Sequence, residues 1–330
     1  MSSARQDIAV GVIYNESRDR VLVAKRPLTS HMGGYWEFPG GKVKNNEPVL
    51  AALKRELYEE LNLKVESAHP FMQIEHDYPD KKIKLDVWVV DKWQGRVYGK
   101  EGQELEWTWI NRLRGKAFPA ANSAIIKAVA LSPLYLITPD LESHDKTFIN
   151  KAEALIESGI KLFQFRSKKT PFSGHEKIVK QLIDICNKNG CLFIYNGKPE
   201  QASKLGAHGV HLNSKELLLS DRKPLNEQYW VAASCHNMEE INHAVTIGVD
   251  FCVLSPIHET TSHSNGQPLG WKKFGEIARG SNIPIYALGG VQPSELNMAI
   301  KNGAWGIAMV SGIWNAREPV KAVRACLKMD

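Results

Sequence analysis

Apolar and polar positions follow two different rhythms along the chain, and the first covers residues 8–130. Strand-like apolar runs lie at 8–14, 21–25, 82–92 and 106–110. A glycine-rich turn and a helical stretch, 48–61, separate the second run from the third, and another helical segment begins at Ser123. Because alternating apolar positions predict half-buried strands and 3.6-residue spacing predicts helices, we expect a mixed α/β domain here.

The second rhythm begins after Leu131-Ser132-Pro133, where a helix-stopping proline separates the two patterns. Apolar runs then alternate with amphipathic helical segments, at 134–138, 161–166, 191–196, 209–212, 231–235, 250–256, 284–290 and 305–312. This alternation predicts a closed (β/α)8 TIM barrel with functional residues at the strand ends. An open doubly wound sheet would need fewer strands and a glycine-rich first turn. We therefore expect two α/β domains, 1–131 and 132–330.

Composition adds the class of protein and its compartment. The chain has 330 residues, of which 43% are hydrophobic and 24% charged, as in soluble globular proteins of two domains. The net charge of +6 favours an anionic small molecule, and no basic block marks a nucleic-acid arm. We find no signal-peptide pattern, no membrane-spanning run and no paired cysteine spacing, so we expect a cytoplasmic protein without disulfides, zinc or a membrane partner. The oligomeric state is left open.

Three glutamates share one face of the predicted helix 48–61. Glu56, Glu59 and Glu60 are spaced i, i+3 and i+4, which brings their carboxylates together. Neighbouring like charges on a helix repel, so the cluster needs either solvent with partners such as Lys54 and Arg55, or a cation. The spacing alone leaves both interpretations open.

The stretch from Gly41 to Leu63 resembles the Nudix box, with Glu47 and then Arg55-Glu56-Leu57-Tyr58-Glu59-Glu60 at the family's spacing. Asn62 replaces the glycine that ends the family's helix, and asparagine tolerates the left-handed backbone needed there. The resemblance implies a Nudix α/β/α sandwich that hydrolyses nucleoside triphosphates with Mg²⁺ or Mn²⁺. It makes Glu56 the candidate catalytic base. It assigns metal binding to Gly40, through its carbonyl, and to Glu56, Glu59, Glu60 and Glu101.

Outside the box, three stretches resemble the MutT type of this family: 25–41, 93–102 and 118–122. This branch removes damaged nucleotides from the pool, so the resemblance implies hydrolysis of 8-oxo-dGTP to 8-oxo-dGMP and diphosphate. It assigns nucleotide contacts to Arg26, His31, Glu37, Phe38, Pro39, Gly40 and Asn122. A generic nucleoside-triphosphate pyrophosphohydrolase is the alternative.

The role of Asn122 has a chemical reason. In 8-oxoguanine, N7 carries a hydrogen beside the O6 acceptor, whereas guanine presents two acceptors. A carboxamide can pair with the donor and the acceptor at once, so it would select the oxidised base. Because Asn122 also precedes the helical segment at Ser123, it could equally be a helix cap.

The second domain resembles the family of thiamine-phosphate synthase and thiazole tautomerase. The resemblance implies a thiazole or pyrimidine phosphate as ligand, with backbone N–H groups at strand ends holding the phosphate. The ligand positions it assigns are Gln164, Arg166, Lys168, Asn196, Ser234, His236, Gly289, Gly290, Val310 and Ser311.

Two departures put synthase activity in question. Gly197 stands where the family has a metal-binding aspartate, and His263 stands where it has a lysine that meets the diphosphate. Glu216 is a candidate substitute carboxylate. His236 could act as a general acid or base, or only complete a hydrogen bond at a strand end.

Three hypotheses follow: a hydrolase with a catalytic thiamine-pathway barrel, a hydrolase whose barrel only binds a phosphate ester, and a sensor in which both sites only bind. The glutamate cluster argues against the sensor. Gly197 and His263 favour the binding barrel.

Overall fold

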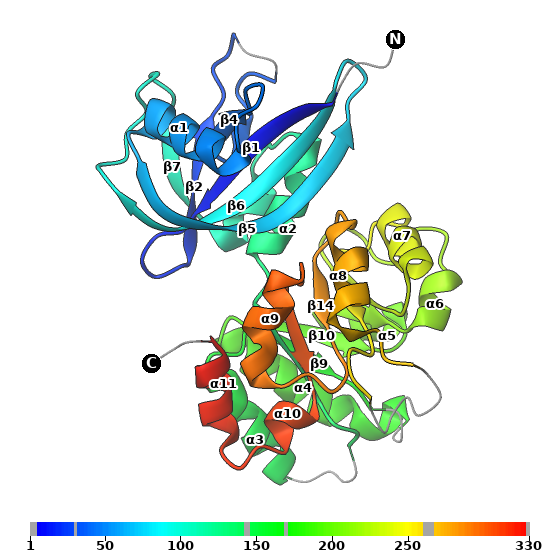
Figure 1. Cartoon of the computed structure of the whole chain (residues 1–330). Helices are drawn as coiled ribbons and strands as arrows, with labels where there is room; N and C mark the ends of the chain where they lie inside the picture. The colour runs from blue at the N-terminus through cyan, green and yellow to red at the C-terminus, as the bar shows by residue number, and fades with distance from the viewer. Residues whose placement is uncertain (1–4, 30–31, 142–145, 168–170, 260–266, 328–330) are drawn as a thin grey trace. The chain divides into compact units, whose positions relative to one another are not determined.

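The computed structural model describes residues 5–29, 32–141, 146–167, 171–259 and 267–327. Three of the residues singled out above, His31, Lys168 and His263, lie outside these ranges. The chain divides into two compact units, Met1–Ala130 and Leu131–Asp330 (Figure 1).

The first unit contains two sheets. One has the strand order β4-β1-β6-β5, formed by Gln6–Ile13 (β1), Gly40–Lys42 (β4), Lys64–Asp77 (β5) and Lys82–Gln94 (β6). In it β1 runs parallel to β6, while the other neighbours are antiparallel. The other sheet has the order β3-β2-β7, formed by Arg20–Lys25 (β2), Trp36–Glu37 (β3) and Leu105–Trp109 (β7).

Helices cover both faces of β1. The helical elements are α1 (Val49–Leu61), η1 (Ile110–Gly115), η2 (Ala120–Asn122) and α2 (Ser123–Val129). Ala9 and Ile13 belong to the apolar cluster under α1, whereas Val10 and Val12 belong to the cluster that holds buried residues of α2. Successive side chains of a strand point to opposite faces, so alternate residues of one strand contact different helices. This is the predicted α/β/α sandwich.

The longest strand, β5, is absent from the pattern-based prediction. Its 14 residues include only two that are fully buried, Val65 and Ile74. Its pairing with β6 shifts register between Val65 and Ser67, shifts back between Ser67 and Ala68, and shifts again between Pro70 and Met72. These irregularities interrupt the regular alternation of faces, so the apolar alternation that identifies a strand is lost.

The second unit is a closed barrel of parallel strands, in the order β10-β11-β12-β13-β14-β15-β8-β9. The strands are Leu134–Ile137 (β8), Leu162–Phe165 (β9), Leu192–Asn196 (β10), Gly209–Leu212 (β11), Trp230–Cys235 (β12), Phe251–Leu254 (β13), Ile285–Ala287 (β14) and Gly306–Met309 (β15). The predicted barrel is therefore confirmed.

Helical elements surround the barrel (Figure 1). They are α3 (Lys146–Glu157), α4 (Phe172–Lys188), α5 (Pro199–Leu205), α6 (Ser214–Leu218), α7 (Met238–Thr246), α8 (Gly270–Arg279), η4 (Pro293–Glu295), α9 (Leu296–Lys301), α10 (Ser311–Trp314) and α11 (Pro319–Leu327).

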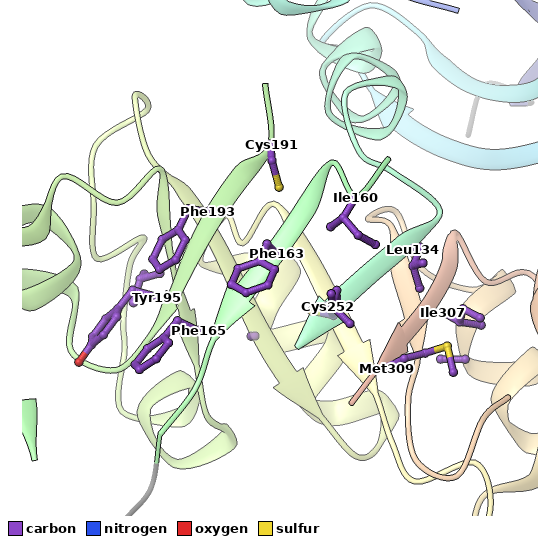
Figure 2. Close-up of a cluster of buried hydrophobic side chains, with 14 of the residues drawn as sticks. Leu134, Ile160, Phe163, Phe165, Cys191, Phe193, Tyr195, Cys252, Ile307 and Met309 are labelled. Carbon is purple, nitrogen blue, oxygen red and sulfur yellow. The ribbon is translucent and has the colours of Figure 1, made fainter. Parts of the chain in front are cut away.

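The barrel strands are buried on both sides. Figure 2 shows Phe163 and Phe193, from neighbouring strands, in the layer that packs against the helices. Tyr135, Phe251 and Tyr286 lie on the other side, with Tyr135 edge-on to Phe251 at 5.4 Å between ring centroids. Burial on both faces makes most positions of each strand apolar, which explains why the sequence pattern predicts these strands, although Gln164, His211 and Ser234 interrupt it.

Among the described residues, no helix has the length and apolar character needed to cross a bilayer. All five cysteines are buried free thiols: Cys186, Cys191, Cys235, Cys252 and Cys326.

Candidate functional site

Helix α1 carries the candidate metal ligands of the first unit. Its buried residues are Ala52, Leu53, Leu57 and Leu61. The helix begins at Val49, and Pro48 is the extended residue before it. The prediction that the helix already includes Pro48 is therefore wrong by one residue. At the other end Asn62 has φ 56° and ψ 33° and donates its N–H to the carbonyl of Tyr58. Asn62 thus supplies the left-handed helix end expected where the family has glycine.

Two glycines allow α1 to lie close against the sheet. Gly40 has φ +145°, and a Cβ at this position would overlap the carbonyl oxygen of Ala9. A Cβ at Gly41 would overlap the carboxyl group of Glu56. Glycine at position 40 lets β4 pair closely with β1, and glycine at position 41 leaves room for the Glu56 carboxyl group where the structure places it.

Arg55 joins several of the acidic side chains. Its guanidinium donates to both carboxylate oxygens of Glu47 at 2.8 Å, to Glu56 at 2.7 Å and to Glu59 at 3.1 Å. These hydrogen bonds lower the pKa of Glu47 to about 2. Arg55 is thus the basic partner that Glu56 and Glu59 would need on a charged helix face without a cation. Glu60 is not part of this network of hydrogen bonds to Arg55.

Glu60 is surrounded by negative charge. Burial is the main cause that raises the pKa of its carboxyl group, to about 8, and the charges of Glu37, Glu56 and Glu101 add to it. A hydrogen bond from the backbone of Gly40 acts in the opposite direction. Four carboxyl groups from β3, α1 and the loop after β6 therefore influence one another at the end of β4.

The loop after β6 is fastened to the end of α1. Lys100 donates its backbone N–H to the Glu60 carbonyl at 2.9 Å, and the Gln103 amide donates to the same carbonyl at 3.1 Å. Gln103 also accepts the N–H of Glu101 at 3.0 Å. These bonds hold the loop that carries the exposed Glu101 against the end of α1, and the charge of Glu101 acts on Glu60.

Whether these residues fit a metal ion can be tested on their chemistry. Within the described ranges no three His, Cys, Asp or Glu side chains are grouped closely enough to hold one, and Glu56 and Glu59 are hydrogen-bonded to Arg55. The donor set does fit a hard divalent cation. Such ions take carboxylate and carbonyl oxygens, and a cation beside Glu60 would favour its charged form against the burial and the neighbouring negative charges that raise its pKa.

The predicted nucleotide contacts lie around an aromatic pair. Phe38 is buried and stacks on Phe118 with ring centroids 5.8 Å apart. The Pro39 carbonyl accepts the N–H of Gly11 at 2.8 Å, so it supports the sheet. Arg26 and Glu37 form an ion pair, and burial raises the pKa of Glu37 while Arg26 opposes the shift.

Asn122 is buried directly before α2, yet its side chain makes no capping hydrogen bond. Its backbone is helical, whereas a capping residue is usually extended. The cap interpretation therefore has no support. One neighbour was missed from the sequence: the Tyr78 hydroxyl accepts the N–H of Ala121 at 3.3 Å. No local pattern indicated it, because the two residues are 43 positions apart.

Inside the barrel, five predicted or neighbouring side chains form one hydrogen-bond chain. Asn196 donates to Gln164 at 3.3 Å, and Gln164 donates to the Tyr135 hydroxyl at 2.6 Å. The Tyr135 hydroxyl lies 3.3 Å from Nδ1 of His211, whose Nε2 lies 2.8 Å from the Ser234 hydroxyl. Burial is the main cause that lowers the pKa of His211, to about 3, so the ring is neutral.

A neutral imidazole has one donor and one acceptor, which sets the direction of this chain. Tyr135 accepts from Gln164 and so can donate to Nδ1 of His211, leaving Nε2–H to donate to Ser234. The Ser234 hydroxyl keeps its own hydrogen to donate onward. The barrel interior can therefore present a fixed hydroxyl donor to an acceptor atom of a ligand.

The remaining predicted ligand positions also lie after barrel strands, at the carboxyl end that parallel strands share. The His236 Nδ1 lies 2.9 Å from the Ser255 carbonyl, which can only accept, so in the neutral ring the lone pair is on Nε2. His236 can therefore donate this hydrogen bond at the strand end through Nδ1 and still keep Nε2 as an acceptor. Arg166 lies 4.0 Å from Asp140. The glycines that follow β14 have left-handed φ, and α10 begins after Val310; these positions are Gly289, Gly290, Val310 and Ser311.

The barrel does not fit the magnesium site of the family it resembles. A Cβ at Gly197 would lie 2.5 Å from Cε1 of Tyr195, so the aromatic ring occupies the direction of the missing carboxylate. The Glu216 carboxylate accepts the N–H of Asn213 at 3.3 Å in a capping box at the start of α6. Both observations explain Gly197 and Glu216 without a metal ion.

Comparisons with known proteins find a different family for each of the two units. The thiamine monophosphate synthase family model matches residues 134–313, and the NUDIX domain model matches residues 9–128. A thiamine-phosphate synthase of Thioalkalivibrio sulfidiphilus is 27% identical over 201 residues, 60% of this chain and 95% of that protein. The 8-oxo-dGTP diphosphatase of Escherichia coli is 39% identical over 119 residues, 36% of this chain and 92% of that protein.

A solved structure supports the barrel fold. The thiamine phosphate pyrophosphorylase from Pyrococcus furiosus has a TM-score of 0.50 and 23% identity, and covers 59% of this chain and 93% of that chain. The architecture is thus a carboxylate-bearing α/β/α sandwich fused to a parallel barrel. The chain belongs to the thiamine monophosphate synthase family through its barrel, and its first unit is a Nudix hydrolase domain.

Proposed function

We propose that the first unit hydrolyses 8-oxo-dGTP to 8-oxo-dGMP and diphosphate with Mg²⁺ or Mn²⁺. The observation that carries this proposal is that α1 holds the Glu56 carboxyl against Gly41 and the Glu60 carboxyl beside the backbone of Gly40, where the charges of Glu37 and Glu101 also act on Glu60. The similarity to a protein named 8-oxo-dGTP diphosphatase supports the substrate.

In this proposal Glu56, Glu59, Glu60, Glu101 and the Gly40 carbonyl hold the cation, which when bound would neutralise phosphate charge and make a water more acidic. Glu56 accepts the proton of the attacking water, whose oxygen bonds to a phosphorus of the α–β bridge while the bond from that phosphorus to the bridging oxygen breaks, so that 8-oxo-dGMP and diphosphate are released. Arg55, at 2.7 Å from Glu56, holds that carboxylate in place.

On the nucleotide side, Phe38, Pro39 and the Arg26–Glu37 pair form the substrate contacts, with His31 as a further contact outside the described residues. The buried Asn122 amide, which no helix cap uses, pairs with N7–H and O6 of the oxidised base.

Asn122→Ala is expected to lower kcat/KM for 8-oxo-dGTP by roughly tenfold to a hundredfold more than for dGTP, since only the oxidised base uses both ends of the amide. Steady-state diphosphate release with each nucleotide measures this. Ser123→Ala is the matched control, because Ser123 is exposed and begins the same helix. A wild-type enzyme that turns over both nucleotides equally well would replace this function with a generic triphosphate pyrophosphohydrolase.

The pKa of Glu60 gives a second test. In the metal-free protein this pKa is raised from 4.5 to about 8, so folding favours the protonated carboxyl group. Its contribution to stability is complete below 4.5 and is lost as the pH rises through about 8. With a chelator present, Glu60→Gln should therefore raise the melting temperature by a few degrees above this window and little below it. Calorimetry at pH values on both sides checks this, and equal effects at both would contradict it.

We further propose that the barrel binds a thiazole or pyrimidine phosphate ester and is not an efficient synthase. The hydrogen-bond chain ending at Ser234 supports ligand binding, and the Tyr195 ring beside Gly197 argues against a metal-bound diphosphate. The proposed ligand contacts are Gln164, Arg166, Asn196, Ser234, His236, Gly289, Gly290, Val310 and Ser311. Lys168, which lies outside the described residues, is a further proposed contact.

A further inference from the structure

The tip of the β5–β6 hairpin is a compact turn. Tyr78 donates its backbone N–H to the Lys81 carbonyl at 2.8 Å, which closes the turn. Pro79 occupies the second position, where its restricted φ favours a tight turn. The Tyr78 side chain therefore leaves the sheet from a constrained backbone.

The Tyr78 ring is held on more than one side. It packs against the apolar cluster that contains Phe38 and Ala121 and that Phe118 also contacts. The His76 ring meets it edge-on with centroids 4.4 Å apart. A ring restrained in this way places its hydroxyl at a defined point.

That hydroxyl accepts the N–H of Ala121 at 3.3 Å. Ala121 lies in the first turn of the short helix η2, where backbone N–H groups have no partner within the helix. The bond therefore satisfies an otherwise unpaired donor and ties the 120–122 turn to the hairpin. Asn122 is the next residue.

The orientation of the Asn122 amide determines which base it can pair with. Pairing one end with a donor and the other with an acceptor requires the carboxamide plane to be fixed before the base arrives. The Asn122 side chain makes no capping hydrogen bond, so the direction in which its amide projects depends on the position of its backbone. The hydrogen bond from Ala121 to Tyr78 restrains that backbone at the preceding residue.

We infer that Tyr78 is a positioning residue for base selection, acting through its hydroxyl bond to Ala121. This inference rests on the proposed hydrolysis of 8-oxo-dGTP. It concerns selectivity and assigns Tyr78 no contact with the reacting atoms.

Tyr78→Phe keeps the ring and removes the hydroxyl. We expect the ratio of kcat/KM for 8-oxo-dGTP to that for dGTP to fall roughly fivefold, the effect of one lost hydrogen bond. In the Asn122→Ala background the same change should have no further effect on this ratio, because the amide that it orients is gone. Tyr58→Phe, an exposed tyrosine on α1, is the matched control and should leave the ratio unchanged.

The outcomes separate the two proposals. If the wild-type full-length protein shows no preference for the oxidised nucleotide, the proposed function fails and this inference fails with it. If the wild type is selective and Tyr78→Phe keeps its ratio, or lowers both kcat/KM values equally, the inference alone fails. An undiminished effect of Tyr78→Phe in the Asn122→Ala background also overturns it.

Discussion

Glu56→Gln and Glu60→Gln are each expected to lower kcat for 8-oxo-dGTP hydrolysis at saturating Mg²⁺ by at least about a hundredfold. Glu56→Gln removes the proposed catalytic base, which is also a proposed metal ligand. Glu60→Gln removes the proposed metal ligand whose carboxylate is exposed to the charges of Glu37, Glu56 and Glu101. Diphosphate release from the full-length chain measures the effect. Activity should also disappear with a chelator and return with Mg²⁺ or Mn²⁺.

Loss of folding would not explain such a result. Glutamine is nearly the same size as glutamate, and at Glu60 it removes a charge that both burial and neighbouring carboxylates disfavour. Glu66→Gln is the matched control, because Glu66 is exposed on β5 and its carboxylate accepts a hydrogen bond from Gln94, which is not one of the proposed metal ligands. Near-normal turnover by Glu56→Gln or Glu60→Gln at saturating Mg²⁺ would refute the proposed metal site.

The barrel is expected to make no thiamine phosphate at the rate of a working synthase. Gly197 provides no carboxylate, and the Tyr195 ring fills the direction in which one would project. The assay should use the full chain carrying Glu56→Gln, so that the first unit cannot hydrolyse the pyrimidine diphosphate substrate. The synthase of Thioalkalivibrio sulfidiphilus, which is similar to this barrel, is the positive control.

The same variant should still bind a phosphate ester. Thiazole phosphate is expected to raise the melting temperature of the barrel once its concentration exceeds the dissociation constant. Ser234→Ala should weaken this shift, because it removes the hydroxyl at the end of the hydrogen-bond chain. Synthesis comparable to the positive control would contradict the proposed loss of catalysis, and absence of any ligand effect would contradict binding.

Some parts of this molecule were readable from local pattern because each is determined within a few residues. The eight barrel strands are buried on both faces and so form short runs that are mostly apolar, with buried polar exceptions such as Gln164 and His211. The spacing of Glu56, Glu59 and Glu60 places them on one face of any helix, whatever surrounds it. The left-handed end at Asn62 is likewise a local preference of that residue.

Other parts depended on contacts between distant segments. The bulges that obscure β5 arise from its pairing with β6. The choice between cap and ligand at Asn122 was undecidable locally, since Asn suits both, and only the absence of a capping bond favours the ligand role. The same holds for Glu216, whose carboxylate serves a capping box.

The sequence by itself determined the two folds and the carboxylate face of α1, because apolar periodicity and helical spacing are local properties of the chain. Only the tertiary structure decided that the charge of Glu37, on β3, acts on Glu60, and that the Tyr195 ring occupies the space beside Gly197. The physical reason is that charge repulsion and excluded volume act through space, between side chains whose separation along the chain carries no information about their distance.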